Sequence, residues 1–419
     1  MGADLLSAYM AKTAKIKDPG INRTAEFDIG YSTGFHNIDF LNGTVVHVNG
    51  NDRNFAYNCV GIIDGSANSI IGRSGSGKST LCIQMAGNII RPFVKKGLPT
   101  ALYVEDIEGS LPLARKEFLL GLNREEINKY VHIRNSGITT ENVFQSIRTI
   151  HDIKVENRKD FEYDTGYYDT DGNRIFKLVP TVFIIDSLPM LLPEDVANAD
   201  EIEGQMVASN IAKTNAQLVK KMTQLQKDAN IIILTVNHIN PDIQMGFIPK
   251  PAQISGLKQG ERLPGGNAAI YLANNMLRVD DSITLKKDKD YRIDGSIVNV
   301  TLLKSRTNAT KRSVPLIFNK TEGKFDDILS MFHLLKSEGK FKGAGAYLFL
   351  DSCPDVKFSV STFMQVYKES NELKKAFAQE VYNLLVTFLS ETKSPENVDN
   401  SLESEFDDIF DSLNRVEVE

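Results

Sequence analysis

A glycine-rich stretch near residue 75 has the residue types needed to bind a triphosphate. IIGRSGSGKST spans residues 70–80 and fits the pattern G-x-x-x-x-G-K-[ST]. In this pattern, glycines let backbone N–H groups surround the phosphates, the lysine supplies a positive charge, and the next residue offers a hydroxyl to Mg²⁺. The predicted cofactors are therefore ATP and Mg²⁺. The predicted nucleotide-binding residues of this stretch are Gly72, Arg73, Ser74, Gly75, Ser76, Gly77, Lys78, Ser79 and Thr80.

Carboxylates that follow two other apolar runs add to the expected chemistry. In FIIDS, Asp186 comes directly after a buried run, where we expect it to hold Mg²⁺ together with Ser79. The segment YVEDIEGS contributes Glu105, Asp106 and Glu108, one of which is expected to orient or deprotonate the attacking water. The residues alone leave the choice among these three open, and a solvated acidic turn is the alternative for each.

Five short apolar runs must position these residues. They are NSIIG (68–72), TALYVE (100–105), YVHIR (130–134), TVFIID (181–186) and NIIILTV (230–236). Apolar strands that alternate with helical stretches are typical of a parallel sheet with both faces covered. The later runs at 276–285, 296–306 and 313–319 alternate as in an antiparallel extension. The predicted fold class is α/β, with a mostly parallel central sheet between two layers of helices.

The chain divides into four expected regions. They are residues 1–60, with a short oligomerisation helix at 3–14; an ATPase core at 61–325; a mainly helical region at 326–393; and an acidic disordered tail at 394–419. The segment 155–178 interrupts the core, and its Asp-Gly pair predicts a protruding hairpin.

Composition limits the class of protein. Apolar residues make up 42% of the 419 residues and charged residues 24%, as is usual for a globular protein. Because no apolar run is long enough to cross a bilayer and the N-terminus is too polar for a signal peptide, we expect a cytoplasmic protein without a membrane partner. Cys59, Cys82 and Cys353 are far apart, so we expect them to pack as small apolar residues rather than to hold zinc or form disulfides.

The net charge of −6 does not exclude nucleic acid as a partner. The tail from Glu396 to Glu419 carries nine acidic residues and one arginine, so the rest of the chain is close to neutral. A tail of this kind is expected to compete with DNA for basic loops or to recruit basic proteins.

Several motifs, taken in order, resemble those of the RecA family of recombinases. The glycine-rich stretch and Asp186 occur in many unrelated ATPases. Three other motifs are more specific to the RecA family: EIEG (201–204), GGNAAIYLANNMLRV (265–279) and LLKSR (302–306). The resemblance covers roughly residues 60–325. The N-terminal region, KSRT and the acidic tail are most similar to the UvsX-type recombinases of T-even-like bacteriophages.

This resemblance implies a fold, an activity and partners. The fold would be a RecA-like ATPase core. The activity would be DNA-dependent ATP hydrolysis by helical filaments on single-stranded DNA, with homologous pairing and strand exchange in recombination and repair. The implied partners are single-stranded DNA, homologous double-stranded DNA, further copies of the chain, a mediator protein and a single-strand-binding protein, in the cytoplasm of a bacterial host. The alternatives are a hexameric replicative helicase and a nucleotide-regulated scaffold without a DNA role.

The resemblance also assigns residues. Loops at about 193–207 and 239–266 would hold DNA. The implied DNA-binding residues are Met206, Met245, Phe247, Lys250, Lys258, Arg262, Gly265, Gly266 and Asn267. His238 would sense the nucleotide's γ-phosphate, where the family has a glutamine. Lys304 and Arg306, expected on one face of a strand, would reach a neighbouring subunit's ATP.

The family pattern favours Glu108 as the catalytic carboxylate, with Lys78, Lys304 and Arg306 as the other catalytic residues. Relative to the family pattern, this chain has one extra residue between Tyr103 and Asp106. Glu105 or Asp106 could therefore hold the catalytic position instead. Leu113 and Ala114 stand where the family has an aromatic residue that stacks on adenine, so the preferred base is not predicted.

Overall fold

The computed structural model describes residues 28–49, 54–109, 111–169, 172–199, 205–241, 256–264, 270, 273–280, 283–285, 293–343 and 346–391. Several predictions lie outside these residues: the helix at 3–14, the motif EIEG, the tail at 394–419, and Met245, Phe247, Lys250, Gly265, Gly266 and Asn267.

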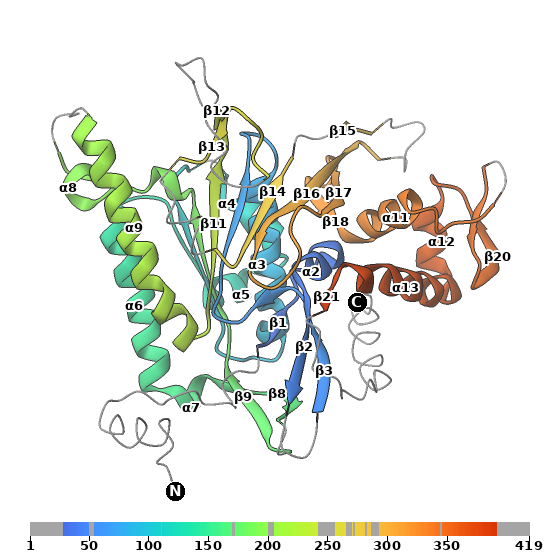
Figure 1. Cartoon of the computed structure of the whole chain (residues 1–419), viewed down its shortest axis with the longest axis horizontal. Helices are drawn as coiled ribbons and strands as arrows, with labels where there is room; N and C mark the ends of the chain where they lie inside the picture. The colour runs from blue at the N-terminus through green and yellow to red at the C-terminus, as the bar shows by residue number, and fades with distance from the viewer. Residues whose placement is uncertain are drawn as a thin grey trace, which may run out of the picture.

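Within the described residues, a ten-stranded sheet forms the centre of the molecule (Figure 1). Its strands are β5 (Ala67–Gly72), β6 (Ala101–Asp106), β7 (Val131–Arg134), β10 (Thr181–Asp186), β11 (Ile231–His238), β14 (Asn275–Val279), β15 (Ile283–Thr284), β16 (Gly295–Ser305), β17 (Ser313–Asn319) and β18 (Lys324–Asp326). The spatial order is β18-β17-β16-β14-β5-β11-β10-β6-β7, and β15 pairs with β16. The five predicted apolar runs form β5, β6, β7, β10 and β11, which are parallel as expected.

The predicted antiparallel extension is confirmed. β14 pairs antiparallel with β16, and the pattern continues through β17 and β18. On its other side, β14 pairs parallel with β5, so this strand joins the extension to the parallel part of the sheet.

Helices cover both faces of the parallel strands. Those that contribute to the two layers are α3 (Lys78–Lys95), α4 (Leu113–Leu120), α5 (Arg124–Tyr130), α6 (Thr140–Glu156) and α9 (Gln205–Asp228). Alternate residues of β10 explain both layers. Val182 and Ile184 belong to the core that includes α3 and α4, whereas Phe183 and Ile185 belong to the core beneath α6 and α9. Figure 1 shows α6 and α9 side by side on their face.

The N-terminal part and the inserted hairpin pack together. Their elements are β1 (Gly30–Tyr31), α2 (His36–Asn42), β2 (Thr44–Asn49), β3 (Asn54–Cys59), β4 (Ile62–Ile63), α7 (Arg158–Phe161), β8 (Glu162–Tyr168) and β9 (Arg174–Leu178). The predicted hairpin is confirmed as β8 and β9, but it packs against the chain near its base rather than protruding freely. Its Tyr163 ring meets Phe93 edge-on at 5.2 Å, and Lys177 pairs with Asp64 at 2.8 Å. The hairpin therefore folds back onto the core and the N-terminal strands.

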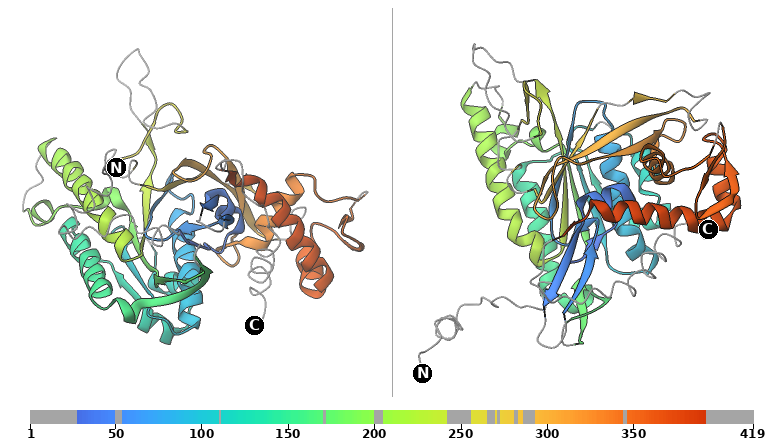
Figure 2. Two further views of the ribbon diagram at one scale, coloured as in Figure 1. Left: turned by 60° about the horizontal axis from the view of Figure 1, so that its bottom comes forward. Right: turned by 45° about the vertical axis from the view of Figure 1, so that its right-hand side comes forward.

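The C-terminal region packs around a second apolar core, which also includes Phe40 of α2 and Ile317 of β17. Figure 2 shows this region beside the central sheet. Its elements are α11 (Asp327–Ser337), β19 (Leu348–Leu350), β20 (Cys353–Phe358), α12 (Phe363–Glu369), α13 (Asn371–Leu385), η3 (Val386–Phe388) and β21 (Ser390–Glu391). The predicted helices correspond to α11 and α13, and the strand pair β19–β20 was not predicted. Phe332 and Phe363 stack in this core at a centroid distance of 4.0 Å.

The remaining short elements are η2 (Leu188–Met190), α8 (Glu194–Ala197), β12 (Asn240–Pro241) and β13 (Glu261–Arg262). The three cysteines are buried, as expected. Among the described helices, none combines the length and the apolar character that a membrane span requires.

Candidate active site

Four adjacent parallel strands bring the chemically important residues to one edge of the sheet. In the order β5, β11, β10 and β6, Gly72 lies beside His238, and Asp186 lies beside Asp106. These are the carboxyl ends of the strands, where ligands bind in open α/β sheets. Residues that are far apart in the sequence are neighbours here because the strand register aligns them.

The glycine-rich loop connects β5 to α3. Gly75 and Gly77 have φ angles of +75° and +90°, which favour glycine, and Gly77 caps the N-terminus of α3. A Cβ atom at Gly75 would meet nothing within 4 Å, so glycine is needed there for the backbone conformation rather than for space. Lys78 is 4% exposed, and its Nζ donates a hydrogen bond to the carbonyl oxygen of Arg73 at 2.6 Å. Burial lowers the pKa of Lys78, although the nearby carboxylates of Asp186 and Glu108 oppose this shift.

Asp186 and Ser79 form the part of the site that suits a cation. Burial raises the pKa of Asp186 to about 6; the carboxylates of Glu108 and Asp106 add to this shift, and a hydrogen bond with Ser79 opposes it. Among the described residues, the buried Oδ1 of Asp186 and Oγ of Ser76 have no hydrogen-bond partner. The unpaired Oδ1 of Asp186 and the hydroxyl of Ser79 fit Mg²⁺, which binds hard oxygen ligands.

Two of the three candidate carboxylates are occupied by cations of their own. Both oxygens of Glu105 accept from Arg134, at 2.6 Å and 2.7 Å. Asp106 pairs with Lys116 and accepts the backbone N–H of Gly109 at 3.0 Å. The two carboxylates are 1% and 2% exposed, so their charges are neutralised within the fold.

Glu108, the third candidate carboxylate, contacts a serine and a histidine rather than an arginine or a lysine. Its Oε1 is 2.7 Å from Nε2 of His238 and accepts a hydrogen bond from Ser187 Oγ. Burial acts to raise the pKa of Glu108, but the bonds from Ser187 and His238 and the charges of His238 and Lys78 lower it overall. Glu108 is therefore an ionised carboxylate that contacts the ends of both β10 and β11. Its position favours it over Glu105 and Asp106 for the catalytic role, which stays a prediction.

The ion pair of Glu105 provides a test of this division. We expect Glu105→Gln to lower the free energy of unfolding by about 1–2 kcal/mol, because Arg134 would lose its charged partner and is only partly exposed to solvent. Thermal unfolding of the two proteins at pH 7 measures the effect. An unchanged midpoint would show that the pair has no structural role.

Lys304 and Arg306 do not join this edge within one chain. β16 ends at Ser305, and the N–H of Arg306 just beyond it donates to the carbonyl oxygen of Asn274 at 3.0 Å. The shared face of Lys304 and Arg306 stays a prediction. Lys304 pairs with Met276, which lies beside Ser69 near the start of β5. The Nζ of Lys304 donates to the carbonyl oxygen of Ile270 at 2.6 Å, and burial together with the charge of Arg306 lowers its pKa to about 8.

The two predicted DNA loops are described only in part. Met206 lies in the first turn of α9. The second loop was predicted to lack structure, but its described ends are joined: β12 and β13 pair antiparallel, with Asn240 opposite Arg262. Lys258 and Arg262 are exposed on the returning segment.

Leu113 and Ala114 are exposed at the start of α4, and their side chains do not indicate which nucleotide base the site prefers. Ser187, Lys116 and Arg134 were not predicted from the sequence. Only Ser187 had a local signal, since it directly follows Asp186, whereas Lys116 and Arg134 come from later elements.

A scan against models of protein families finds no match to this chain, and a search of curated proteins finds none either. A proposal of function therefore rests on the geometry of the site and on the order of the motifs.

Proposed function

We propose that the chain is a DNA-dependent ATPase that assembles into helical filaments on single-stranded DNA and exchanges strands with a homologous duplex. The observation that carries the ATPase part is the convergence of Lys78, Ser79, Asp186 and Glu108 on one edge of the sheet, through hydrogen bonds and mutual charge effects. A cation, a hydroxyl, a buried carboxylate and an ionised carboxylate are the groups needed to bind a triphosphate and direct water to it.

Each residue then has a role that follows from its position. Lys78, which donates to the Arg73 carbonyl here, would donate to phosphate oxygens instead. Ser79 and Asp186 would hold Mg²⁺, which supplies neutralisation of phosphate charge when bound. Glu108 would orient the attacking water and accept its proton. His238, bonded to Glu108 and followed within two residues by β12, would connect this chemistry to the second loop.

The DNA part of the proposal rests on the motif order described above and on two further features. Lys258 and Arg262 are exposed cations on the returning segment of the second loop, where they suit contacts to DNA phosphates. Lys304 and Arg306 lie toward the opposite end of β5 from the glycine-rich loop, which suits contact with the nucleotide of a neighbouring copy. The RecA-like fold and an origin in phage-infected bacteria belong to the same proposal.

Electron microscopy tests this proposal. With single-stranded DNA and a non-hydrolysable ATP analogue, we expect regular helical filaments, and with ATP we expect hydrolysis that depends on DNA. DNA affinity should fall steeply as salt is raised, because several phosphates are neutralised per subunit. Closed rings that unwind forked duplexes in one direction would favour the helicase alternative. A rate of ATP hydrolysis that does not change when DNA is added would favour the scaffold alternative.

A further inference from the structure

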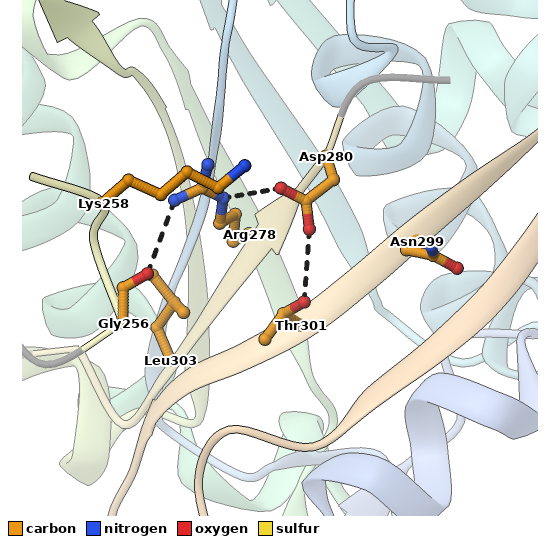
Figure 3. Close-up of a pocket in the computed structure, with 7 residues that line it drawn as sticks. All are labelled: Gly256, Lys258, Arg278, Asp280, Asn299, Thr301 and Leu303. Atoms are coloured by element: carbon orange, nitrogen blue, oxygen red, sulfur yellow. Dashed lines mark hydrogen bonds and ion pairs between the residues drawn. The ribbon is translucent and has the colours of Figure 1, made fainter. Parts of the chain in front are cut away.

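A buried pair of opposite charges lies where the second loop returns to the sheet. Glu261 in β13 accepts two hydrogen bonds from the guanidinium of Arg278 in β14, at 2.7 Å and 3.0 Å. Both side chains are only 6% exposed. Figure 3 shows Arg278 among its other partners, where it donates to the carboxylate of Asp280 at 2.7 Å and to the carbonyl oxygen of Gly256 at 3.4 Å. The guanidinium is therefore held from several sides.

Glu261 also fixes the backbone of the returning segment. Its carboxylate accepts the backbone N–H of Lys258 at 2.9 Å, and its own N–H donates to the Lys258 carbonyl at 3.1 Å. Glu261 lies opposite Pro241, three residues beyond His238. The carboxylate of Glu261 thus attaches the segment that carries Lys258 and Arg262 to β14, in addition to the hydrogen bond between Arg278 and Gly256 and the packing of Leu257 and Leu263 near Met276.

The same carboxylate faces the glycine-rich loop. Oε1 of Glu261 is 3.5 Å from the guanidinium of Arg73, whose side chain is 56% exposed. Burial acts to raise the pKa of Glu261, but Arg278, the Lys258 N–H and the charge of Arg73 lower it overall, so Glu261 is ionised. Arg278 binds it tightly and Arg73 lies at the limit of hydrogen-bond distance. A change in the loop would therefore alter the Arg73 contact before the Arg278 contact.

Arg73 is tied to Lys78 through its backbone. Its carbonyl oxygen accepts the Nζ of Lys78, the residue proposed to move onto phosphate oxygens. Phosphate binding would remove that hydrogen bond and free the peptide at Arg73 to turn. Its guanidinium would also gain phosphate oxygens as competitors for Glu261.

We propose that Glu261 is a positioning residue, which links the nucleotide state of the glycine-rich loop to the returning segment of the second loop through Arg73. The inference rests on the proposed function, and it adds a second connection besides the contact between Glu108 and His238. Without nucleotide, Arg73 helps to hold Glu261 and the segment at 258–262 in the arrangement seen here. With nucleotide, Arg73 releases Glu261, and the exposed cations of the segment change position relative to the sheet.

Single-stranded DNA binding with and without a saturating ATP analogue tests this link. The quantity of interest is the ratio of the two affinities, measured by fluorescence anisotropy for wild type, Arg73→Ala, Glu261→Gln and the double variant. We expect each single variant to reduce the ratio by roughly fivefold, at the lower end of typical coupling between sites. The double variant should reduce it no further, because both changes break the same contact.

Asp280→Asn is the matched control. It removes another carboxylate partner of Arg278 and leaves Glu261 and Arg73 in place, so the ratio should stay at the wild-type value. Nucleotide affinity is measured separately for each variant, which ensures saturation. If Arg73→Ala and Glu261→Gln keep the wild-type ratio, this inference is wrong while the proposed function stands. If wild type itself shows no effect of nucleotide on DNA affinity, the proposed function fails and the inference with it.

Discussion

A Glu108→Gln variant is expected to hydrolyse ATP at least 100-fold more slowly than wild type while it still assembles on single-stranded DNA in the presence of ATP. Removing a general base typically costs about 10² to 10⁴ in rate. The amide keeps the size of the side chain and can still contact Ser187 and His238, so the edge of the sheet should stay intact. Phosphate release under saturating ATP measures the first effect, and electron microscopy of the complexes measures the second.

Glu105→Gln is the matched control for this experiment. It makes the same chemical change three residues earlier, but Glu105 is engaged by Arg134 rather than aimed at the site. Below its unfolding midpoint, this variant should hydrolyse ATP within a few-fold of the wild-type rate. The reverse pattern, a slow Glu105→Gln and an active Glu108→Gln, would indicate that Glu105 is the catalytic carboxylate. It would refute the role given to Glu108.

The pH dependence separates the two acidic residues of the site. The pKa of Glu108 is lowered, so it stays ionised through the neutral range and loses its charge only below its ordinary value near 4.5. Asp186, with a pKa of about 6, is protonated first as the pH falls. Mg²⁺-dependent hydrolysis should therefore decline as the pH falls through about 6. Excess Mg²⁺ should shift this decline to lower pH, because the cation competes with the proton.

The sheet could be predicted where the signal was local. β10 and β11 are apolar runs such as TVFIID and IIILTV, and strands buried on both faces need side chains of this kind at every position. The parallel pairing of β14 with β5 could not be predicted in the same way, because the residues of β14 would suit either orientation.

In the candidate site, too, some residues are marked by a local signal and others depend on distant partners. Lys78, Ser79 and Asp186 could be predicted because a motif or a strand end marks them in the sequence. The choice among Glu105, Asp106 and Glu108 depends on partners from other elements. Arg134 in β7 and Lys116 in α4 engage the first two, and no spacing announces either contact.

The second loop shows most clearly which contacts cannot be predicted from the sequence. Its length and its glycines predicted a long connection without structure. The pairing of β12 with β13, and the anchor of Glu261 on Arg278, depend on a strand that follows the loop. A buried arginine in β14 is not expected from an apolar run such as NMLRV. Its burial is explained by its partner Glu261, which comes from the loop before the strand.

An Asp186→Asn variant is expected to be more stable than wild type without ligands, although it should lose most Mg²⁺-dependent hydrolysis. The folded-state pKa of about 6 is above the ordinary value of 3.8, so the folded state disfavours the ionised carboxylate. This penalty is absent below pH 3.8, grows as the pH rises toward 6, and is fully present at pH 7. The shift corresponds to roughly 2–3 kcal/mol, of which the amide should recover about 1–2 kcal/mol. The unfolding midpoint should rise by a few degrees.

Asp106→Asn is the control that separates this effect from a general preference for amides at the edge. Asp106 is also buried, but Lys116 neutralises it, so the same change should lower the midpoint by leaving a buried cation without its partner. Mg²⁺ and an ATP analogue should raise the midpoint of wild type and of Asp106→Asn, but not that of Asp186→Asn, because a ligand stabilises only a fold that binds it. A less stable Asp186→Asn, or one that Mg²⁺ and the analogue stabilise as much as wild type, would contradict the cation-binding role. Opposite shifts for two neighbouring carboxylates would instead show that Asp186 is kept at a cost to stability, as expected of a residue retained for its function.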